Sequence, residues 1–168
     1  MPDATRIVIN TGPILALIAA LGDLEVLKSL YKEVHVPVEV GREILVGGTL
    51  EFGVQQFMDA SWLNKWKIQQ AIPPFLDNTL DQGEAAVIQL ALAEKIRTVC
   101  IDESVGRRVA RLNGLLLTGS VGILLRAKRE GLMSSVGKPL QRMQKNGIWL
   151  SDRVVSFALR QSGESEQE

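Results

Sequence analysis

The stretch RIVINTGPILALIAALG, residues 6–22, carries the signals that decide the fold. It begins with a short β-branched run, typical of a buried strand, and continues as an apolar segment of helical length that ends at Gly22. Asn-Thr-Gly-Pro joins the two parts, with Thr11 as the expected N-cap and Pro13 in the first turn. A strand that leads directly into a helix starts a β-α-β unit. Asn10 therefore marks a junction of the kind at which open parallel sheets bind ligands.

The rest of the chain repeats this alternation of strands and helices. Further strands are expected in EVHVP (33–37), LNKWKI (63–68), TVCI (98–101) and LLLTG (115–119), with helical patterns around them. This order predicts an α/β fold in which a central, mostly parallel sheet lies between helices. We expect a single domain over residues 1–161 and a disordered acidic tail over residues 162–168.

The composition narrows the classes of protein that the chain can represent. The 168 residues have a net charge of zero, so a strongly basic nucleic-acid-binding protein is not indicated. Cys100 is the single cysteine and His35 the single histidine, which excludes an intrachain disulfide and a zinc cluster of cysteines and histidines. The first residues lack a signal-peptide pattern and the apolar runs are too short to cross a membrane, so we expect a cytoplasmic protein.

Polar residues follow the expected strands and open the expected helices. Asn10 and Asp102 come directly after two buried runs. Glu43 lies on an expected helix over residues 38–45, and Glu84 lies near the first turn of a helix for which Asp81 is the N-cap candidate. Because the carboxyl ends of parallel strands share one edge, we expect these side chains to converge there. Carboxylates crowded in one crevice repel each other unless a cation or protons neutralise them, and oxygen ligands without His or Cys favour Mg²⁺ or Mn²⁺. Such a site suits phosphodiester hydrolysis.

Each of these residues also has an ordinary structural interpretation. Glu84 follows Asp81 by three residues, which is the spacing of a capping box. Asp102 could cap the helix that follows it, and Asn10 could be a turn residue that bonds to its own backbone. Glu39, one helical turn before Glu43, is the glutamate that we expect to be solvated.

Five segments in order carry a resemblance to PIN-domain proteins. They extend the match over about residues 6–150 and are VINTGPILALIAAL (8–21), VHVPVEVGREIL (34–45), LDQGEAAVIQLALAE (80–94), VCIDESVGRRVA (99–110) and GLLLTGSVGILLRAKREGL (114–132). The sequence resembles most the prokaryotic subgroup related to the toxin ribonucleases of toxin–antitoxin pairs. The resemblance implies a PIN-like three-layer α/β/α fold and a metal-dependent endoribonuclease.

The resemblance also assigns the site residue by residue. It implies that Asn10, Glu43, Glu84 and Asp102 surround Mg²⁺ or Mn²⁺, with Asn10 where the wider family has aspartate. It places Thr11 beside the first of these positions. The RNA substrate, a small antitoxin protein and a second copy of the chain in a homodimer are the implied partners.

Other residues near these motifs have weaker assignments. Ser120 is expected to bond to the metal ligands or to the substrate, and Arg107, Arg108 and Arg111 to bind RNA phosphates if they are not simply a solvated helix face. Trp62, Trp66 and Trp149 are interpreted as packing residues.

Two alternatives stay open. The first is a PIN-like binding or regulatory protein that lost activity through Asn10. The second, a small-molecule phosphohydrolase, fits the neutral charge but not the resemblance.

Overall fold

A five-stranded, entirely parallel sheet forms the centre of the computed structural model, which describes residues 5–46 and 52–164. Its order is β3-β2-β1-β4-β5, so the first strand lies in the middle. The strands are β1 Arg6–Ile9, β2 Glu33–Val36, β3 Asn64–Lys65, β4 Thr98–Cys100 and β5 Leu116–Thr118. In β1, Val8 pairs with His35 of β2 on one side and with Val99 of β4 on the other.

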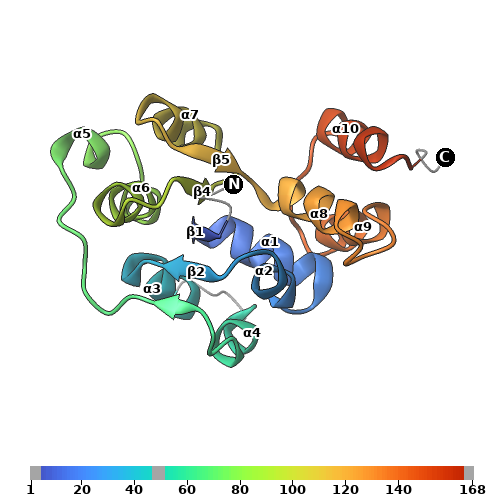
Figure 1. The fold of residues 1–168 in the computed structure, drawn as a ribbon, viewed down its shortest axis with the longest axis horizontal. Coiled ribbons are helices and arrows are strands. Elements are labelled where there is room, and N and C mark those ends of the chain that lie inside the picture. Colours follow the sequence, from blue (N-terminus) through green and yellow to red (C-terminus); the bar gives the residue numbers. More distant parts are fainter. Residues whose placement is uncertain (1–4, 47–51, 165–168) are drawn as a thin grey trace.

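Helices cover both faces of this sheet, which gives the predicted three-layer α/β/α architecture. Figure 1 shows α3 and α6 on one side of the strands and α1, α2, α8 and α9 on the other. The helices are α1 Thr11–Leu21, α2 Glu25–Leu30, α3 Val38–Val46, α4 Val54–Asp59, α5 Pro74–Asp77, α6 Gln82–Glu94, α7 Ser104–Leu112, α8 Ser120–Arg129, α9 Gly137–Lys145 and α10 Asp152–Ser162.

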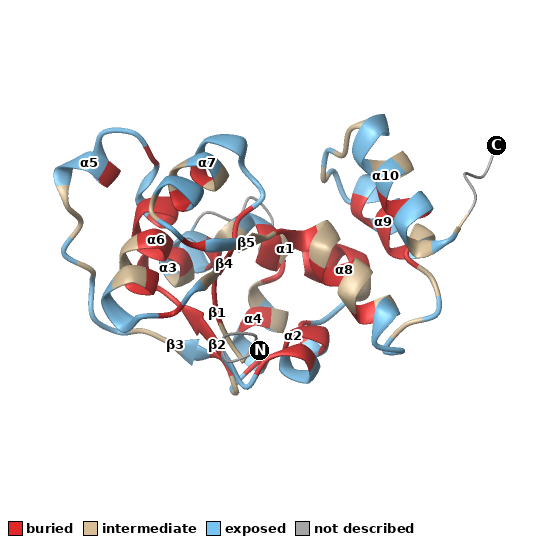
Figure 2. Ribbon diagram, turned by 45° about the horizontal axis from the view of Figure 1, so that its top comes forward, coloured by how far each residue is buried: buried red, intermediate tan, exposed pale blue. Residues whose placement is uncertain are grey.

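The core explains why α1 and α6 are apolar around most of their circumference. Helix α1 packs against α9, α3 and α8, while α6 packs against β1, β4, α3 and α7. A helix with neighbours on several sides needs apolar residues on several sides, whereas a surface helix needs one apolar stripe. Figure 2 shows buried residues on the strands and along both helices. These two helices therefore hold their first turns firmly at the carboxyl edge of the sheet.

Several expectations from the sequence need correction in detail. Thr11 is the first residue of α1, and Asn10 occupies the N-cap position. The edge strand expected over residues 63–68 is reduced to Asn64–Lys65. Trp149 is 83% exposed and is not a packing residue, because the short segment between α9 and α10 leaves its ring outside the core.

The carboxyl terminus departs from the expected boundary at residue 161. Helix α10 continues to Ser162, and its C-cap residue Gly163 has a φ of 75°. Glu164 follows, and its carboxylate accepts hydrogen bonds from Ser135, Val136 and Gly137. Part of the tail that was expected to be disordered is thus fixed in place, and residues 165–168 lie outside the described residues.

Candidate active site

The carboxyl edge of the sheet brings the four predicted site positions into one region. Asn10 follows β1 directly, and its backbone N–H donates to the carbonyl of Cys100 at the end of β4, 3.1 Å away. Asp102 lies two residues beyond Cys100. Helix α6, which runs toward β4, begins at this edge, and α3 follows β2. Parallel strands impose this arrangement, because every strand ends on the same side.

Asn10 does not form the side-chain hydrogen bond to its own backbone that a turn residue would form. It is 6% exposed and occupies the N-cap position of α1, yet its side chain makes no capping hydrogen bond. Its Oδ1 is buried and has no hydrogen-bond partner. Asparagine at an N-cap normally stabilises the helix through this oxygen, and an unpaired buried acceptor costs free energy. The side chain is therefore held away from the helix end that it could have capped.

Glu43 reaches the same place from α3. Its Oε2 accepts a hydrogen bond of 2.8 Å from Thr11 Oγ1. A Cβ atom at Gly83 would overlap Glu43 Oε1 and would lie 3.3 Å from Asn10 Oδ1. Two oxygens from two elements thus face one small space, which stays open because residue 83 has no side chain. The hydroxyl of Thr11 orients a carboxylate here.

Glu84 is the buried acid of the edge. It is 6% exposed, and its Oε2 faces Gly106 on α7. Burial raises the pKa of its carboxyl group to about 8, and the hydrogen bond and charge of Asp81 and the charges of Glu103 and Glu43 add to this effect. Asp81 also accepts the backbone N–H of Glu84 at 2.8 Å, so this half of the capping box is formed. A neighbouring cation would restore the ionised form.

Asp102 is oriented by the start of α8. Ser120 donates to it twice, from its backbone N–H to Oδ1 and from Oγ to Oδ2, both at 2.8 Å. The N-cap residue of α7 is Glu103, so Asp102 does not cap the helix that follows it. Instead its carboxylate lies at the amino-terminal end of α8, where the helix dipole favours a negative charge. Ser120 itself is 2% exposed and is a positioning residue in this arrangement.

The three arginines of α7 separate into two kinds. Arg107 Nη1 donates to the carbonyl of Ile101 at 2.7 Å and to that of Thr118 at 3.2 Å, so it joins the ends of β4 and β5. A Cβ at Gly119 would lie 2.6 Å from Asp102 Oδ1 and 3.0 Å from Arg107 Nη1, which places this cation beside the carboxylate. Arg108 and Arg111 are exposed at the surface. The sequence interpretation did not distinguish the anchored arginine from the other two.

Glu39 corrects another expectation. It is 3% exposed, and both of its carboxylate oxygens are buried without a hydrogen-bond partner. We expected it to be solvated, but α3 packs against α1, α4 and α6 and covers its first turn. The sequence offered one signal, the four-residue spacing that places Glu39 and Glu43 on one face of the helix. Asp81 and Glu103 also belong to this acidic edge, because both raise the pKa of Glu84.

The donors at this edge fit a hard divalent cation, although their side chains are not gathered around one point. Within residues 5–46 and 52–164, no three Asp, Glu, His or Cys side chains form a group that could hold a metal ion as they stand. The available groups are nevertheless all oxygens, and Asn10 Oδ1 lacks a partner in the space that it shares with Glu43 Oε1. Oxygen donors of this kind match Mg²⁺ or Mn²⁺.

The protein is thus an α/β protein whose parallel sheet has acidic side chains along its carboxyl edge. A family model described as a PIN domain matches residues 6–164. This chain therefore belongs to the PIN-domain family, whose members are generally dependent on divalent metal ions and associated with RNA. No curated protein and no solved structure gave a significant match. In the described part of the chain, no helix is long and apolar enough to span a bilayer.

Proposed function

We propose that this protein is a metal-dependent endoribonuclease of the PIN-domain type. Glu43, Glu84 and Asp102 would hold Mg²⁺ or Mn²⁺, together with the side-chain oxygen of Asn10. The observation that carries the proposal is the buried Oδ1 of Asn10, which has no partner although the residue occupies an N-cap position. A buried acceptor that forgoes the available cap is explained by a ligand that donates to it or coordinates it.

The chain's own residues would bind and orient the reacting groups. Thr11 fixes Glu43 and Ser120 fixes Asp102, so two carboxylates are oriented before substrate arrives. Arg108 and Arg111 are exposed on the helix that follows Asp102, where cations attract the phosphates of a single strand. The bound ion would supply the Lewis acidity needed for attack of water on a phosphodiester.

An RNA cleavage assay tests the proposal. A labelled single-stranded RNA is incubated with the protein in metal-depleted buffer and then with added Mn²⁺ or Mg²⁺. We expect the native protein to cleave the RNA internally only when metal is added. This cleavage should be lost in Glu43→Gln, which keeps the size of the exposed side chain. Glu94→Gln, at the exposed far end of α6, is the matched control and should cleave as the native protein does. Cleavage that survives in Glu43→Gln would show a contaminating nuclease.

A second candidate function has support of its own. Asn10 carries no negative charge, and the carboxylates do not converge as a ready set of ligands. Both observations favour a PIN-like protein that binds RNA or regulates without cutting. The second function would be supported if the native protein binds RNA without cutting it in either metal and the Asn10→Asp variant cuts it.

The proposal also covers binding partners and cellular location. As the toxin of a toxin–antitoxin pair, the protein would be a cytoplasmic homodimer, inhibited by a small protein that inserts a basic side chain among Glu43, Glu84 and Asp102. Light scattering of the purified chain measures the oligomeric state. Suppression of growth by the native protein, and normal growth with Glu43→Gln, would support the role of a toxin.

A further inference from the structure

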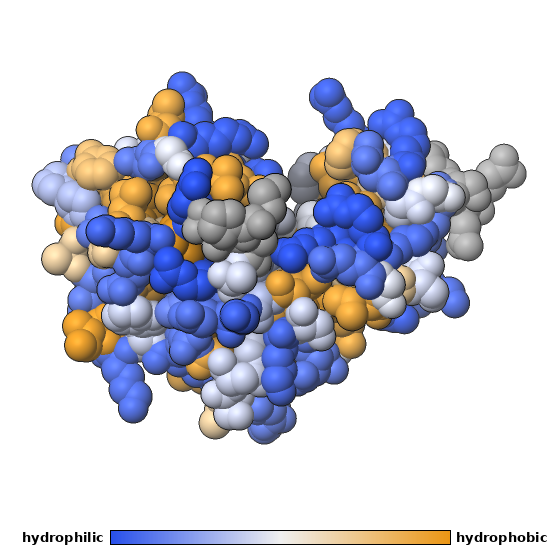
Figure 3. All heavy atoms as spheres, viewed as in Figure 1, coloured by the Kyte–Doolittle hydropathy of each residue, from blue (hydrophilic) through white to orange (hydrophobic). Residues whose placement is uncertain are grey.

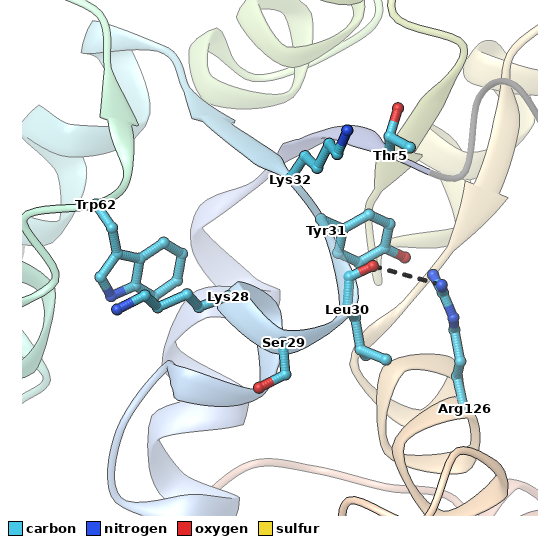
Figure 4. Close-up of a pocket in the computed structure, with 8 residues that line it drawn as sticks. All are labelled: Thr5, Lys28, Ser29, Leu30, Tyr31, Lys32, Trp62 and Arg126. Carbon is cyan, nitrogen blue, oxygen red and sulfur yellow. Dashed lines mark hydrogen bonds between the residues drawn. The ribbon is translucent and has the colours of Figure 1, made fainter.

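A second hollow lies at the opposite, amino-terminal edge of the sheet. Figure 4 shows it between the start of β1, the end of α2 and the side of α8. It is an open depression of about 490 Å³, and its lining includes Thr5, directly before β1, and Lys32, directly before β2. That volume is in the range of small-ligand sites. The hollow is therefore separated from Asn10 and the acids by the length of the sheet.

The charge of this pocket is one-sided. Lys28, Lys32 and Arg126 line it, and none of its described lining residues is acidic, while Arg126 Nε is paired with Glu130 Oε2 at 3.4 Å. The chain as a whole has equal numbers of basic and acidic residues. Figure 3 shows hydrophilic and hydrophobic residues interleaved over one face of the molecule. Among the described residues, Lys28 and Lys32 form no ion pair and remain available to an anion.

The walls of the pocket are held in place. The carbonyl of Thr5 accepts hydrogen bonds from the backbone N–H groups of Lys32, at 2.8 Å, and Glu33, at 3.1 Å. The Arg126 guanidinium lies 4.9 Å from the centre of the buried Tyr31 ring, and its Nη2 donates to the carbonyl of Leu30 at 3.4 Å. This contact partly neutralises a carbonyl at the end of α2 that would otherwise repel an anion. A ligand would thus meet a largely preformed site.

Trp62 supplies an observation that points to a ligand. Its indole packs partly against the core and also lines the pocket. Its Nε1 is buried without a hydrogen-bond partner. In the view of Figure 4, the nitrogen-bearing edge of the ring is turned toward the Lys28 side chain. Buried indole N–H groups normally find an acceptor, so this unpaired donor next to the pocket calls for a partner that the described residues do not supply.

We propose that this pocket binds a nucleotide, with its base lying against Trp62 and its phosphate held by the unpaired cations of Lys28 and Lys32, whose long side chains can turn toward it. Cations hold phosphate oxygens through charge-assisted hydrogen bonds, and aromatic rings stack on bases of any sequence. The nucleotide can be free or can be the end of an RNA strand, because both present the same phosphate and base. The pocket lies away from the acidic edge, so its ligand does not depend on the proposed nuclease activity.

Calorimetric titration tests the proposal, with AMP as the probe and metal-depleted, low-salt buffer. We expect AMP to bind in about the millimolar range or tighter, and about tenfold tighter than inorganic phosphate because of base stacking. Lys28→Ala/Lys32→Ala should weaken AMP binding about tenfold or more. Lys67→Ala/Lys145→Ala removes the same charge from exposed positions elsewhere and should leave the affinity within about twofold. No binding of AMP, or equal loss in both double variants, would overturn the proposal.

A second variant separates the base from the phosphate. Trp62→Phe keeps an aromatic wall and breaks no hydrogen bond within the protein, but it removes the indole N–H and part of the stacking surface. It should weaken AMP binding several-fold and leave the binding of inorganic phosphate unchanged. Inorganic phosphate that binds as tightly as AMP would reduce the pocket to an anion site and refute the nucleotide. Titration of a 5′-phosphorylated dinucleotide against AMP distinguishes the strand end from the free nucleotide. Glu43→Gln should bind AMP as the native protein does, although it should not cleave RNA. The test of AMP binding is therefore independent of the test of RNA cleavage.

Discussion

Two buried or half-buried glutamates in this protein experience opposite environments. Glu84, at the acidic edge, is surrounded by Asp81, Glu103 and Glu43, and burial together with these acids raises its pKa to about 8. Glu164 lies beyond α10 at the start of α9. Burial alone would raise its pKa, but hydrogen bonds to its carboxylate outweigh burial and hold the pKa well below 4.5. The donors are Val136 N at 2.8 Å, Ser135 Oγ at 2.8 Å, Lys128 Nζ at 3.0 Å and Gly137 N at 3.1 Å.

The difference teaches how to tell a structural carboxylate from one that awaits a partner. At Glu164 the fold itself supplies a cation, a hydroxyl and two backbone N–H groups, and the carboxylate anchors the end of the chain. At Glu84 the fold supplies further negative charge. A folded protein keeps such a costly arrangement where function requires it, because uncompensated acids destabilise the native state. Four variants test this contrast, in order of expected effect.

Glu84→Gln should give the largest change in stability. The pKa of Glu84 rises from 4.5 to about 8 on folding, so the native state binds a proton that the unfolded chain has released. The native protein therefore loses stability as the pH rises from 4.5 through 8. The neutral amide avoids this loss, and we expect the variant to be roughly 3 kcal/mol more stable than the native protein at pH 9 without metal, and nearly equal at pH 4. Urea unfolding at the two pH values measures it, and a constant difference would contradict the assignment.

Glu164→Gln should act in the opposite direction. We expect a loss of about 2 kcal/mol at pH 7, because charge-assisted hydrogen bonds are the stronger ones. The folded pKa is below 4.5, so the stabilisation is complete above that pH and disappears as the pH falls toward the folded pKa. The native and variant unfolding curves should thus converge in acid. Glu94→Gln, an exposed control, should change stability by less than about 0.5 kcal/mol at either pH.

Asn10→Asp sharpens the contrast by adding a fourth acid to the edge. The new charge should lower the stability of the metal-free protein by about 1 kcal/mol, because it faces Glu43 across the space at Gly83. It should also raise the affinity for Mn²⁺ and give RNA cleavage at least as fast as that of the native protein. Thermal melts with and without Mn²⁺ compare the two forms. Equal shifts in both would show that the side chain of Asn10 does not contact the metal ion.

The smallest effect is expected at the rim of the acidic edge. Arg108→Ala/Arg111→Ala should weaken RNA binding several-fold and lower its dependence on salt concentration, because both side chains are exposed cations. Arg107 is left intact, since it joins the ends of β4 and β5 and its loss would disturb Asp102 indirectly. Filter binding at two ionic strengths provides the measurement. Unchanged affinity would make these two arginines ordinary surface residues.

Local sequence signals determined the elements and the edge on which the site lies. The alternation of β-branched runs with helical patterns predicted the parallel sheet, and the structure confirms it. Asp81 as N-cap of α6 and a helix over residues 38–45 are confirmed as well. Such signals involve neighbours along the chain, where propensity, capping and side-chain period act directly. The placement of Asn10 at the end of β1 followed from the same reasoning.

Tertiary structure alone decided which polar groups have partners. Glu39 is buried because α3 lies among other helices, Arg107 bonds to carbonyls of two strands, and Glu164 meets donors 27–29 residues earlier in the chain. The lack of a partner for Asn10 Oδ1 and the raised pKa of Glu84 likewise depend on residues from distant parts of the sequence. Burial and hydrogen bonding depend on contacts between segments, and a one-dimensional pattern does not specify the distances between them. The sequence therefore predicts where the acids gather, while packing determines which of them remain unsatisfied.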